Sequence, residues 1–273
     1  MSSLDHRLSK VSETLDRMHP SGLLYTTYEA RLLDQLDRSR LPQHVAVLAD
    51  GNRRWARLNA PGEPLVAGYE AGADRLREFC TWCDAVGTPI ITLWVLSTDN
   101  LQRAETGELG PLLKVIESLV DSLADNSRWR VQAVGDLDLL PDDMAESLCR
   151  AGRTSIGHVG MHINVAVAYG GRHELRDAFR SLLAEEAEKG TSLADLARTL
   201  EIDQIEDHLY TRGQPDPDLI IRTSGEQRLS GFLMWQSAHS EFYFCEALWP
   251  DFRKVDFLRA LRSFTQRERR YGR

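Results

Sequence analysis

The fold of this chain is decided by the stretch His44–Arg57, which reads HVAVLADGNRRWAR. An apolar run ends at Asp50, and a glycine, an asparagine and two arginines follow it. A buried strand that ends at Asp50 would place this carboxylate at the carboxyl edge of an open α/β sheet, where such sheets bind ligands. Gly51 lets the backbone approach a ligand, and the N–H groups after it can bind an anion together with the arginines. Asp-Gly is also typical of a hairpin corner, but no alternating second strand follows here.

Length and charge narrow the class of protein. A chain of 273 residues suits one large domain or two small ones. The net charge of −8 argues against broad nucleic-acid binding, which needs a basic face. The sequence contains neither a long apolar run nor a charged-then-apolar leader, so we expect no membrane span and no signal peptide. The expected location is the cytoplasm, with at most peripheral membrane contact.

The four cysteines do not suggest a disulfide framework. Cys80 and Cys83 form a C-x-x-C pair, which could be redox-active. They fall at helical spacing in the middle of an expected helix, however, whereas redox pairs lie at helix N-termini, where the dipole lowers the thiol pKa. We therefore expect buried core thiols.

Helical and strand patterns alternate along the chain, which favours a mostly parallel central sheet flanked by helices in one α/β domain. Residues 1–41 are expected to form a helical extension, and residues 42–273 the main domain. The expected strands cover 45–49, 90–96, 129–134, 163–168 and 219–222. The expected helices cover 68–86, 109–123, a segment from 141, 174–188, 193–209 and a segment from 255, and 232–244 is an apolar, aromatic segment.

Four of the expected strands end in polar clusters that contain or precede an arginine. Besides the Asp50 cluster, these are Ser97–Asn100 followed by Arg103, Tyr169–Glu174, and Arg222–Ser230. Each cluster alone is an ordinary strand end. Together they would meet at one edge of the sheet and form a site suited to two phosphorylated ligands.

These clusters resemble the motifs of the cis-prenyltransferases, the undecaprenyl-diphosphate-synthase-like family, over roughly residues 42–261. The matching segments are Asp50–Ala56, Leu96–Asn100 with Arg103, Asn164 through Tyr169–Arg172, Asp218–Glu226, Arg228–Gln236, Glu241–Phe244 and Leu248–Phe252. Several motifs in the family's order make a specific match. The fold implied is the same α/β sheet, with a hydrophobic tunnel between the sheet and the helices.

Three other classes of protein share single features with this chain. Asp142–Glu146 is similar to the aspartate-rich box of the trans-prenyltransferases, but that family is all-helical and needs two boxes, so these acids are expected at a helix N-terminus. A non-catalytic scaffold relative should have lost Asp50 and the C-terminal arginines, which this chain keeps. A phosphate-ester hydrolase would leave the apolar segments 93–96 and 112–123 without a ligand role.

The resemblance implies a reaction between isopentenyl diphosphate and an allylic diphosphate, with Mg²⁺ as cofactor. Asp50 would be catalytic and would hold the metal, and Glu241 would supply a second metal carboxylate from the partner's site region or from across the crevice. The allylic diphosphate would be bound by Gly51, Asn52, Arg53, Arg54 and Trp55. Isopentenyl diphosphate would be bound by Arg222, Arg228, Leu229 and Ser230. Ser97, Thr98, Asp99 and Arg103 would line the site.

Asn100 matches the family's proposed proton acceptor. Neutral asparagine is a poor base, so we expect the diphosphate or a water molecule to take the proton in the end. The chain departs from the family pattern at Arg53, Leu65, Asp99, Leu101 and Gln227. Because an arginine is usual at the position of Leu65, one contact to the allylic diphosphate is expected either to be missing or to be supplied by Arg57.

The resemblance also implies a product length and an oligomeric state. Val95 matches a tunnel-wall position where medium-chain members carry alanine, which favours a short product made by one or a few additions to a geranyl or similar primer. The alternative is a medium-chain polyprenyl diphosphate. The aromatic segment 232–252 is expected to be partly core and partly the interface of a two-fold homodimer.

Overall fold

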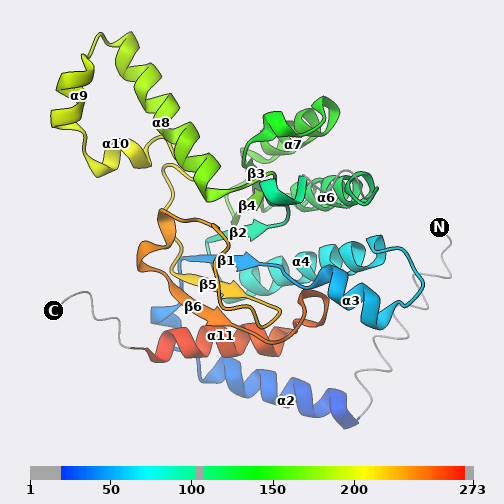
Figure 1. The fold of residues 1–273 in the computed structure, drawn as a ribbon. Coiled ribbons are helices and arrows are strands. Elements are labelled where there is room, and N and C mark those ends of the chain that lie inside the picture. Colours follow the sequence, from blue (N-terminus) through cyan, green and yellow to red (C-terminus); the bar gives the residue numbers. More distant parts are fainter. Residues whose placement is uncertain (1–19, 102–106, 268–273) are drawn as a thin grey trace. The chain divides into compact units, whose positions relative to one another are not determined.

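The computed structural model describes residues 20–101 and 107–267. Its centre is a six-stranded parallel sheet of order β3-β4-β2-β1-β5-β6 (Figure 1). The strands are β1 His44–Leu48, β2 Ile90–Trp94, β3 Arg130–Val134, β4 His162–Ala166, β5 Leu219–Arg222 and β6 Glu241–Phe244. The predicted α/β class is confirmed. The sixth strand lies in the segment that the sequence indicated only as apolar and aromatic.

Strand β1 lies inside the sheet, between β2 and β5. All five of its residues are buried, as expected of a parallel strand that is covered on both faces. Leu48, its last residue, pairs with Trp94 of β2 and Arg222 of β5. The segments that follow these three strands therefore leave the sheet at the same edge.

The helices alternate with the strands, as the sequence indicated. Between β1 and β5 the structure has α3 Asn52–Asn59, α4 Val66–Val86, α5 Thr98–Leu101, α6 Leu109–Ala124, α7 Asp142–Ser155, α8 Gly171–Glu188, α9 Leu193–Thr199 and α10 Ile202–Glu206. The single helix predicted over 193–209 is wrong. It is two short helices beside α8 (Figure 1), because the backbone is extended at Glu201, which caps α10 through a reciprocal contact with Gln204.

Helix α4 packs closely against α3, and two glycines of α4 allow this. A Cβ atom on Gly68 would lie 2.2 Å from the carbonyl oxygen of Asn52, and one on Gly72 would lie 2.4 Å from Asn52 Oδ1. Cys80 and Cys83 are fully buried in the same helix, and burial raises the pKa of both thiols. The prediction of core cysteines is confirmed.

Contacts divide the chain into two compact units, Pro42–Phe252 and a unit made of residues 1–41 and 253–273. In the second unit, the described helices α2 Pro20–Asp34 and α11 Lys254–Gln266 pack together. Arg253 donates a hydrogen bond of 2.7 Å to the Tyr25 hydroxyl there. The predicted boundary between an extension over 1–41 and a catalytic domain over 42–273 stays a prediction.

Within the described residues, the helices are too short or too polar to cross a bilayer.

Candidate active site

The ends of four neighbouring strands meet at the carboxyl edge of the sheet. Asp50 follows β1, Ser97 follows β2, Tyr169 follows β4, and Arg222 ends β5. Ser97 and Tyr169 form a parallel bridge beyond their strands, and the Thr98 N–H donates to the Tyr169 carbonyl at 3.1 Å. The structure thus brings the four strand ends to one edge of the sheet, but no residue of the Tyr169–Glu174 cluster lines the pocket that opens there.

A pocket of about 570 Å³ opens at this edge. At and after the strand ends it is lined by charged and polar residues, among them Asp50, Arg54 and Arg222. Helices α4 and α6 add mostly apolar side chains, which are Ala73 and Leu76 of α4 and Leu109, Leu112, Val115, Ile116 and Leu119 of α6. The pocket can hold an anionic head at the sheet edge and an apolar chain between the helices.

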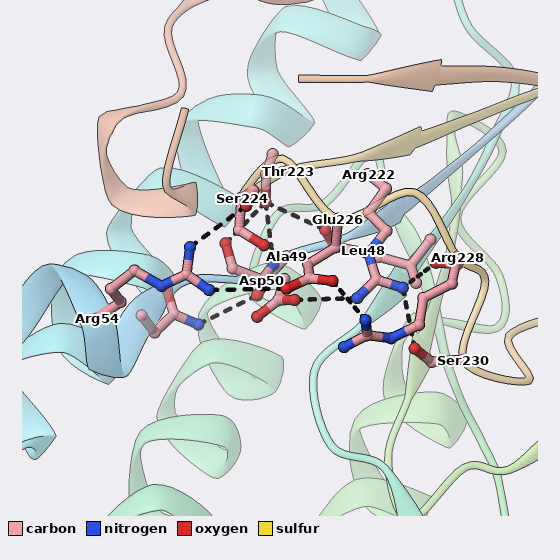
Figure 2. Close-up of polar contacts among 11 residues, drawn as sticks. Leu48, Ala49, Asp50, Arg54, Arg222, Thr223, Ser224, Glu226, Arg228 and Ser230 are labelled. Atoms are coloured by element: carbon pink, nitrogen blue, oxygen red, sulfur yellow. Dashed lines mark hydrogen bonds and ion pairs between the residues drawn. The ribbon is translucent and has the colours of Figure 1, made fainter. Parts of the chain in front are cut away.

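Arg222 lines the pocket and makes polar contacts with Asp50, Arg228 and Ser230 (Figure 2). Its side chain is 5% exposed and makes an ion pair of 3.1 Å with Asp50 Oδ2. Its Nη1 donates to Ser230 Oγ at 2.9 Å and to the carbonyl oxygen of Arg228. Its buried Nε has no hydrogen-bond partner among the described residues. A buried guanidinium with a spare donor is well suited to an anionic ligand.

The backbone of Asp50 is held from two sides. Its N–H donates to Thr223 Oγ1 at 3.0 Å, and its carbonyl oxygen accepts from the Thr223 hydroxyl at 2.8 Å and from the Trp249 N–H at 2.9 Å. Its carboxylate remains 45% exposed and lines the pocket. Gly51 follows with φ of +109°, and a Cβ there would lie 2.9 Å from Leu248. Glycine is therefore required beside this carboxylate.

Glu226 lies between the guanidinium groups of two arginines (Figure 2). Its carboxylate is 3.9 Å from Arg54 Nη2 and 2.5 Å from Arg228 Nη1. The two arginine side chains are 54% and 67% exposed. Exposed ion pairs contribute little to stability, so both guanidinium groups can exchange this carboxylate for phosphate oxygens at small cost.

The segment after β2 forms the side of the pocket. Ser97 Oγ accepts a hydrogen bond of 3.2 Å from the N–H of Asn100 in the short helix α5. Ser97, Asp99 and Asn100 all line the pocket. The side chain of Asn100 is therefore placed to meet a ligand that enters between the polar and apolar parts of the pocket.

Most of the predicted site residues line this pocket. They are Asp50, Gly51, Asn52, Arg53, Arg54, Ser97, Asp99, Asn100, Arg222, Arg228 and Ser230. Four others, Trp55, Thr98, Leu229 and Glu241, do not line it. Trp55 donates its indole N–H to Asp251 at 2.8 Å, Thr98 is 8% exposed, and Leu229 packs against a core cluster that includes Leu48 and Tyr169. Arg103 lies outside the described residues.

Glu241 lies at the other end of the sheet from the Asp50 of its own chain. It pairs with Leu219, which pairs with Val45 near the start of β1. Asp50 is five residues beyond Val45, which corresponds to about 16 Å along the strands. The two carboxylates therefore do not meet within one chain, and a metal shared by both would need Glu241 from a second chain.

The pocket also has lining residues that the sequence did not assign to the site. Glu226, Tyr69 and Glu108 line it, and Tyr69 donates to Glu108 at 3.4 Å. Arg57 lines it too, and its contact to the allylic diphosphate stays a prediction. Glu226 could have been suspected, because it stands between Arg222 and Arg228 in the sequence. Tyr69 and Glu108 carry no such signal, since only the packing of α4 against α6 brings them together.

Comparison with known proteins identifies the family. The sequence profile of the family described as "Putative undecaprenyl diphosphate synthase" matches residues 48–272. The chain belongs to this prenyltransferase family. The match covers the pocket residues, strands β2 to β6 and the motifs around Asp50 and Arg222, so the predicted family and an isoprenyl transferase activity are confirmed.

Relatives within the prenyltransferase family are similar over nearly the whole chain. The (2Z,6E)-farnesyl diphosphate synthase of Thermobifida fusca is 58% identical over 249 residues, which cover 91% of this chain and 97% of that protein. The short-chain Z-isoprenyl diphosphate synthase of Mycobacterium bovis is 49% identical over 253 residues, covering 92% and 96%. The expected short-chain product agrees with these names.

A solved structure shares the fold. Lavandulyl diphosphate synthase from Lavandula x intermedia, in complex with dimethylallyl diphosphate, superposes with a TM-score of 0.78 at 34% identity. The match covers 86% of this chain and 100% of that one. The six-stranded sheet is therefore that of a prenyltransferase.

Proposed function

We propose that this protein is a Z-prenyl diphosphate synthase that adds one or a few isopentenyl units to a short allylic diphosphate. The observation that carries the proposal is the pocket, which is cationic at the sheet edge and apolar between α4 and α6. The names of the relatives in Thermobifida fusca and Mycobacterium bovis support a short product with a Z double bond.

In this proposal the two diphosphates bind on opposite sides of Asp50. Arg222, Arg228 and Ser230 hold isopentenyl diphosphate. Arg222 connects the three residues, because it donates hydrogen bonds to the Ser230 hydroxyl and to the Arg228 carbonyl. The start of α3, from Asn52 to Arg54, holds the allylic diphosphate. Breaking the allylic C–O bond leaves negative charge on the diphosphate, and fixed guanidinium and N–H donors stabilise that charge as it develops.

Mg²⁺ is part of the proposal, and the residues present fit it. Mg²⁺ binds through one or two carboxylates together with substrate phosphates, and the Asp50 carboxylate is 45% exposed toward the pocket beside phosphate-binding arginines. When bound, the ion would neutralise charge on the diphosphate groups. The ion pair of Asp50 with Arg222 holds the carboxylate in place until then.

After the new carbon–carbon bond forms, a neighbouring carbon of the isopentenyl unit loses a proton so that the new double bond can form, and we place this carbon near Asn100. The backbone N–H of Asn100 donates to the Ser97 carbonyl and hydroxyl oxygens, which fixes the backbone of a residue that lines the pocket. A neutral amide accepts a hydrogen bond but is too weak a base to keep a proton. We therefore assign Asn100 to orientation and assign final proton acceptance to the diphosphate or to water.

Chain length would be set by the apolar part of the pocket. Val95 is partly buried and lines the pocket beside Leu96 and Ser97, and Leu119, which is 1% exposed, lines the pocket on α6. Packed interiors do not absorb extra methylene groups cheaply. A growing chain that reaches these side chains would stop.

Assembly into a two-fold homodimer is also proposed. Phe232, Trp249 and Phe252 are fully buried in their own chain, so they belong to the core and only the rest of the aromatic segment is available for an interface. Phe244 at the end of the edge strand β6 is 41% exposed, and Glu241 needs a second chain to meet a metal. A monomeric mass by light scattering at micromolar protein would contradict the dimer.

The cytoplasmic location expected from the sequence stays a prediction.

The decisive experiment is a reaction of the purified protein with isopentenyl diphosphate, Mg²⁺ and a panel of allylic primers. We expect short Z-prenyl diphosphates by reverse-phase chromatography, and none when Mg²⁺ is chelated. Long polyprenyl products would overturn the short-chain proposal and leave the family unchanged. Hydrolysis of the primer without condensation would overturn the proposed function.

A further inference from the structure

A buried carboxylate lies behind the pocket and does not line it. Glu174 of α8 is 1% exposed. Its Oε1 accepts hydrogen bonds from the Tyr210 N–H and from Gln236 Nε2, each at 3.0 Å, and its Oε2 accepts one from the Tyr169 hydroxyl. Burial raises the pKa of the Glu174 carboxyl, and the three donors oppose that rise. Burying a carboxylate costs free energy, so we looked to its hydrogen-bond partners for the role of Glu174.

The Glu174 network reaches the segment that follows Arg228. The Tyr169 oxygen, which donates its hydrogen to Glu174, accepts the N–H of Leu233 at 3.1 Å. Gln236 ties the end of the same segment to Glu174. The buried carboxylate therefore holds the segment 229–236 at two points, one through Tyr169 and one directly.

The segment 229–236 would not keep its shape without such support. Ser230 and Leu233 have φ of +52° and +45°, a left-handed conformation that non-glycine residues adopt only when their surroundings impose it. The N–H of Gly171, the first residue of α8, donates to the Gly231 carbonyl at 3.0 Å. A Cβ at Gly171 would lie 2.4 Å from that oxygen. The start of α8 therefore packs closely against this turn.

The turn carries protein groups that are proposed to bind isopentenyl diphosphate. Ser230 Oγ and the Arg228 carbonyl both accept from Arg222. A shift of the turn would move these groups relative to the Arg222 guanidinium. Misplacement of about 1 Å in a binding site is enough to weaken it strongly.

We propose that Glu174 and Tyr169 are positioning residues that hold the 229–236 turn in the shape that binds the diphosphate of isopentenyl diphosphate. The inference rests on the proposed assignment of Arg222, Arg228 and Ser230 to that substrate. Neither Glu174 nor Tyr169 lines the pocket, so both act through the turn.

Two conservative variants test the network. In Glu174→Gln, the amide can keep its oxygen toward Tyr210 and Gln236, but its NH₂ group then faces the Tyr169 hydroxyl. The hydroxyl hydrogen loses its acceptor in a buried site, which is costly. Tyr169→Phe removes the acceptor of the Leu233 N–H and leaves the aromatic packing with Phe232 in place.

Each variant has a matched control. Glu186→Gln makes the same change on the same helix, at a carboxylate that is 9% exposed and accepts from Lys189 and Thr191. Tyr210→Phe removes a hydroxyl that donates to Asp177, from a ring that packs on Tyr169. Neither control side chain holds the 229–236 turn by a hydrogen bond.

The measurement is steady-state kinetics of the full chain with each substrate varied in turn, together with thermal melting. We expect each test variant to raise the KM for isopentenyl diphosphate about tenfold, the scale of one lost buried hydrogen bond. The KM for the allylic diphosphate should stay within about twofold, as should both constants in the controls. The KM for isopentenyl diphosphate in the double variant should rise no further than in the more affected single variant, because both residues act through the same turn.

Other outcomes overturn the inference. Equal rises in both KM values, or a fall in kcat with lowered melting temperature and unchanged KM values, would assign the network to general stability. Unchanged constants in both test variants would also refute it, and the proposed function would stand if Arg228→Ala still raised the KM for isopentenyl diphosphate. If Arg228→Ala left that KM unchanged, the substrate assignment itself would be wrong. Should Glu174→Gln fail to fold, Tyr169→Phe decides.

Discussion

Replacement of Arg222 by alanine tests whether a buried guanidinium carries the binding of isopentenyl diphosphate. The side chain is 5% exposed and touches Asp50, Ser230 and the Arg228 carbonyl. A charge-assisted hydrogen bond from such a group to a phosphate oxygen is worth about 2–3 kcal/mol. We therefore expect kcat/KM for isopentenyl diphosphate to fall by about 30- to 150-fold.

The fold should survive this substitution. Loss of Arg222 leaves the Asp50 carboxylate without its ion-pair partner, but that carboxylate is 45% exposed and can be hydrated. Arg228→Ala is the informative comparison. The Arg228 side chain is 67% exposed, and its guanidinium pairs only with Glu226 among the described residues. Solvent screens such a group, so its loss should cost about 1 kcal/mol and less than about tenfold in kcat/KM.

The assay is initial-rate kinetics with labelled isopentenyl diphosphate at a saturating allylic primer, with urea unfolding to check stability. Arg176→Ala serves as control, since its guanidinium pairs with Asp136 and Asp177 and does not line the pocket. If the Arg228 variant lost as much activity as the Arg222 variant, burial would not be the deciding factor. If the Arg222 variant lost less than about threefold, the binding site would have to lie elsewhere.

Three further predictions concern the metal, the product and the primer. Asp50→Asn keeps the shape of the side chain but removes its charge, so condensation should fall by at least about 100-fold, and near-normal turnover at saturating Mg²⁺ would contradict the role of Asp50. Val95→Ala should lengthen the product, as seen by reverse-phase chromatography, and an unchanged product would exclude this wall as the limit. Gly72→Ala would place a Cβ 2.4 Å from Asn52 Oδ1 and should raise the KM for the allylic primer, whereas Gly110→Ala, a helical glycine with open space around it, should leave that KM unchanged.

In a parallel sheet, the residues at the carboxyl ends of the strands can be predicted from the sequence. Asp50, Ser97, Tyr169 and Arg222 each follow or end a short apolar run, and a near-continuous apolar run is what a parallel strand covered on both faces looks like in a sequence. Once strands alternate with helices, the sheet is parallel and the polar ends meet at one edge. The composition of the site, with its arginines and one central carboxylate, could thus be anticipated without coordinates.

Residues whose surroundings come from distant parts of the chain could not be placed in this way. Trp55 stands in the motif of the site but donates to Asp251, and Glu241 begins a strand whose register puts it at the opposite edge. The aromatic segment 232–252 divides between core and surface, because an apolar side chain looks the same in sequence whether a neighbouring element covers it or not.

The family, the α/β class and the charged groups at the strand ends could be predicted from the sequence, because they depend on residue type, order and local periodicity. The pairing of β5 with β1, which sets Arg222 3.1 Å from Asp50 across more than half of the chain, is visible only in the tertiary structure. The tertiary structure alone shows that Glu174 lies buried against the 229–236 turn. Such pairings arise from the packing of whole faces against one another, and local sequence carries no record of which face meets which.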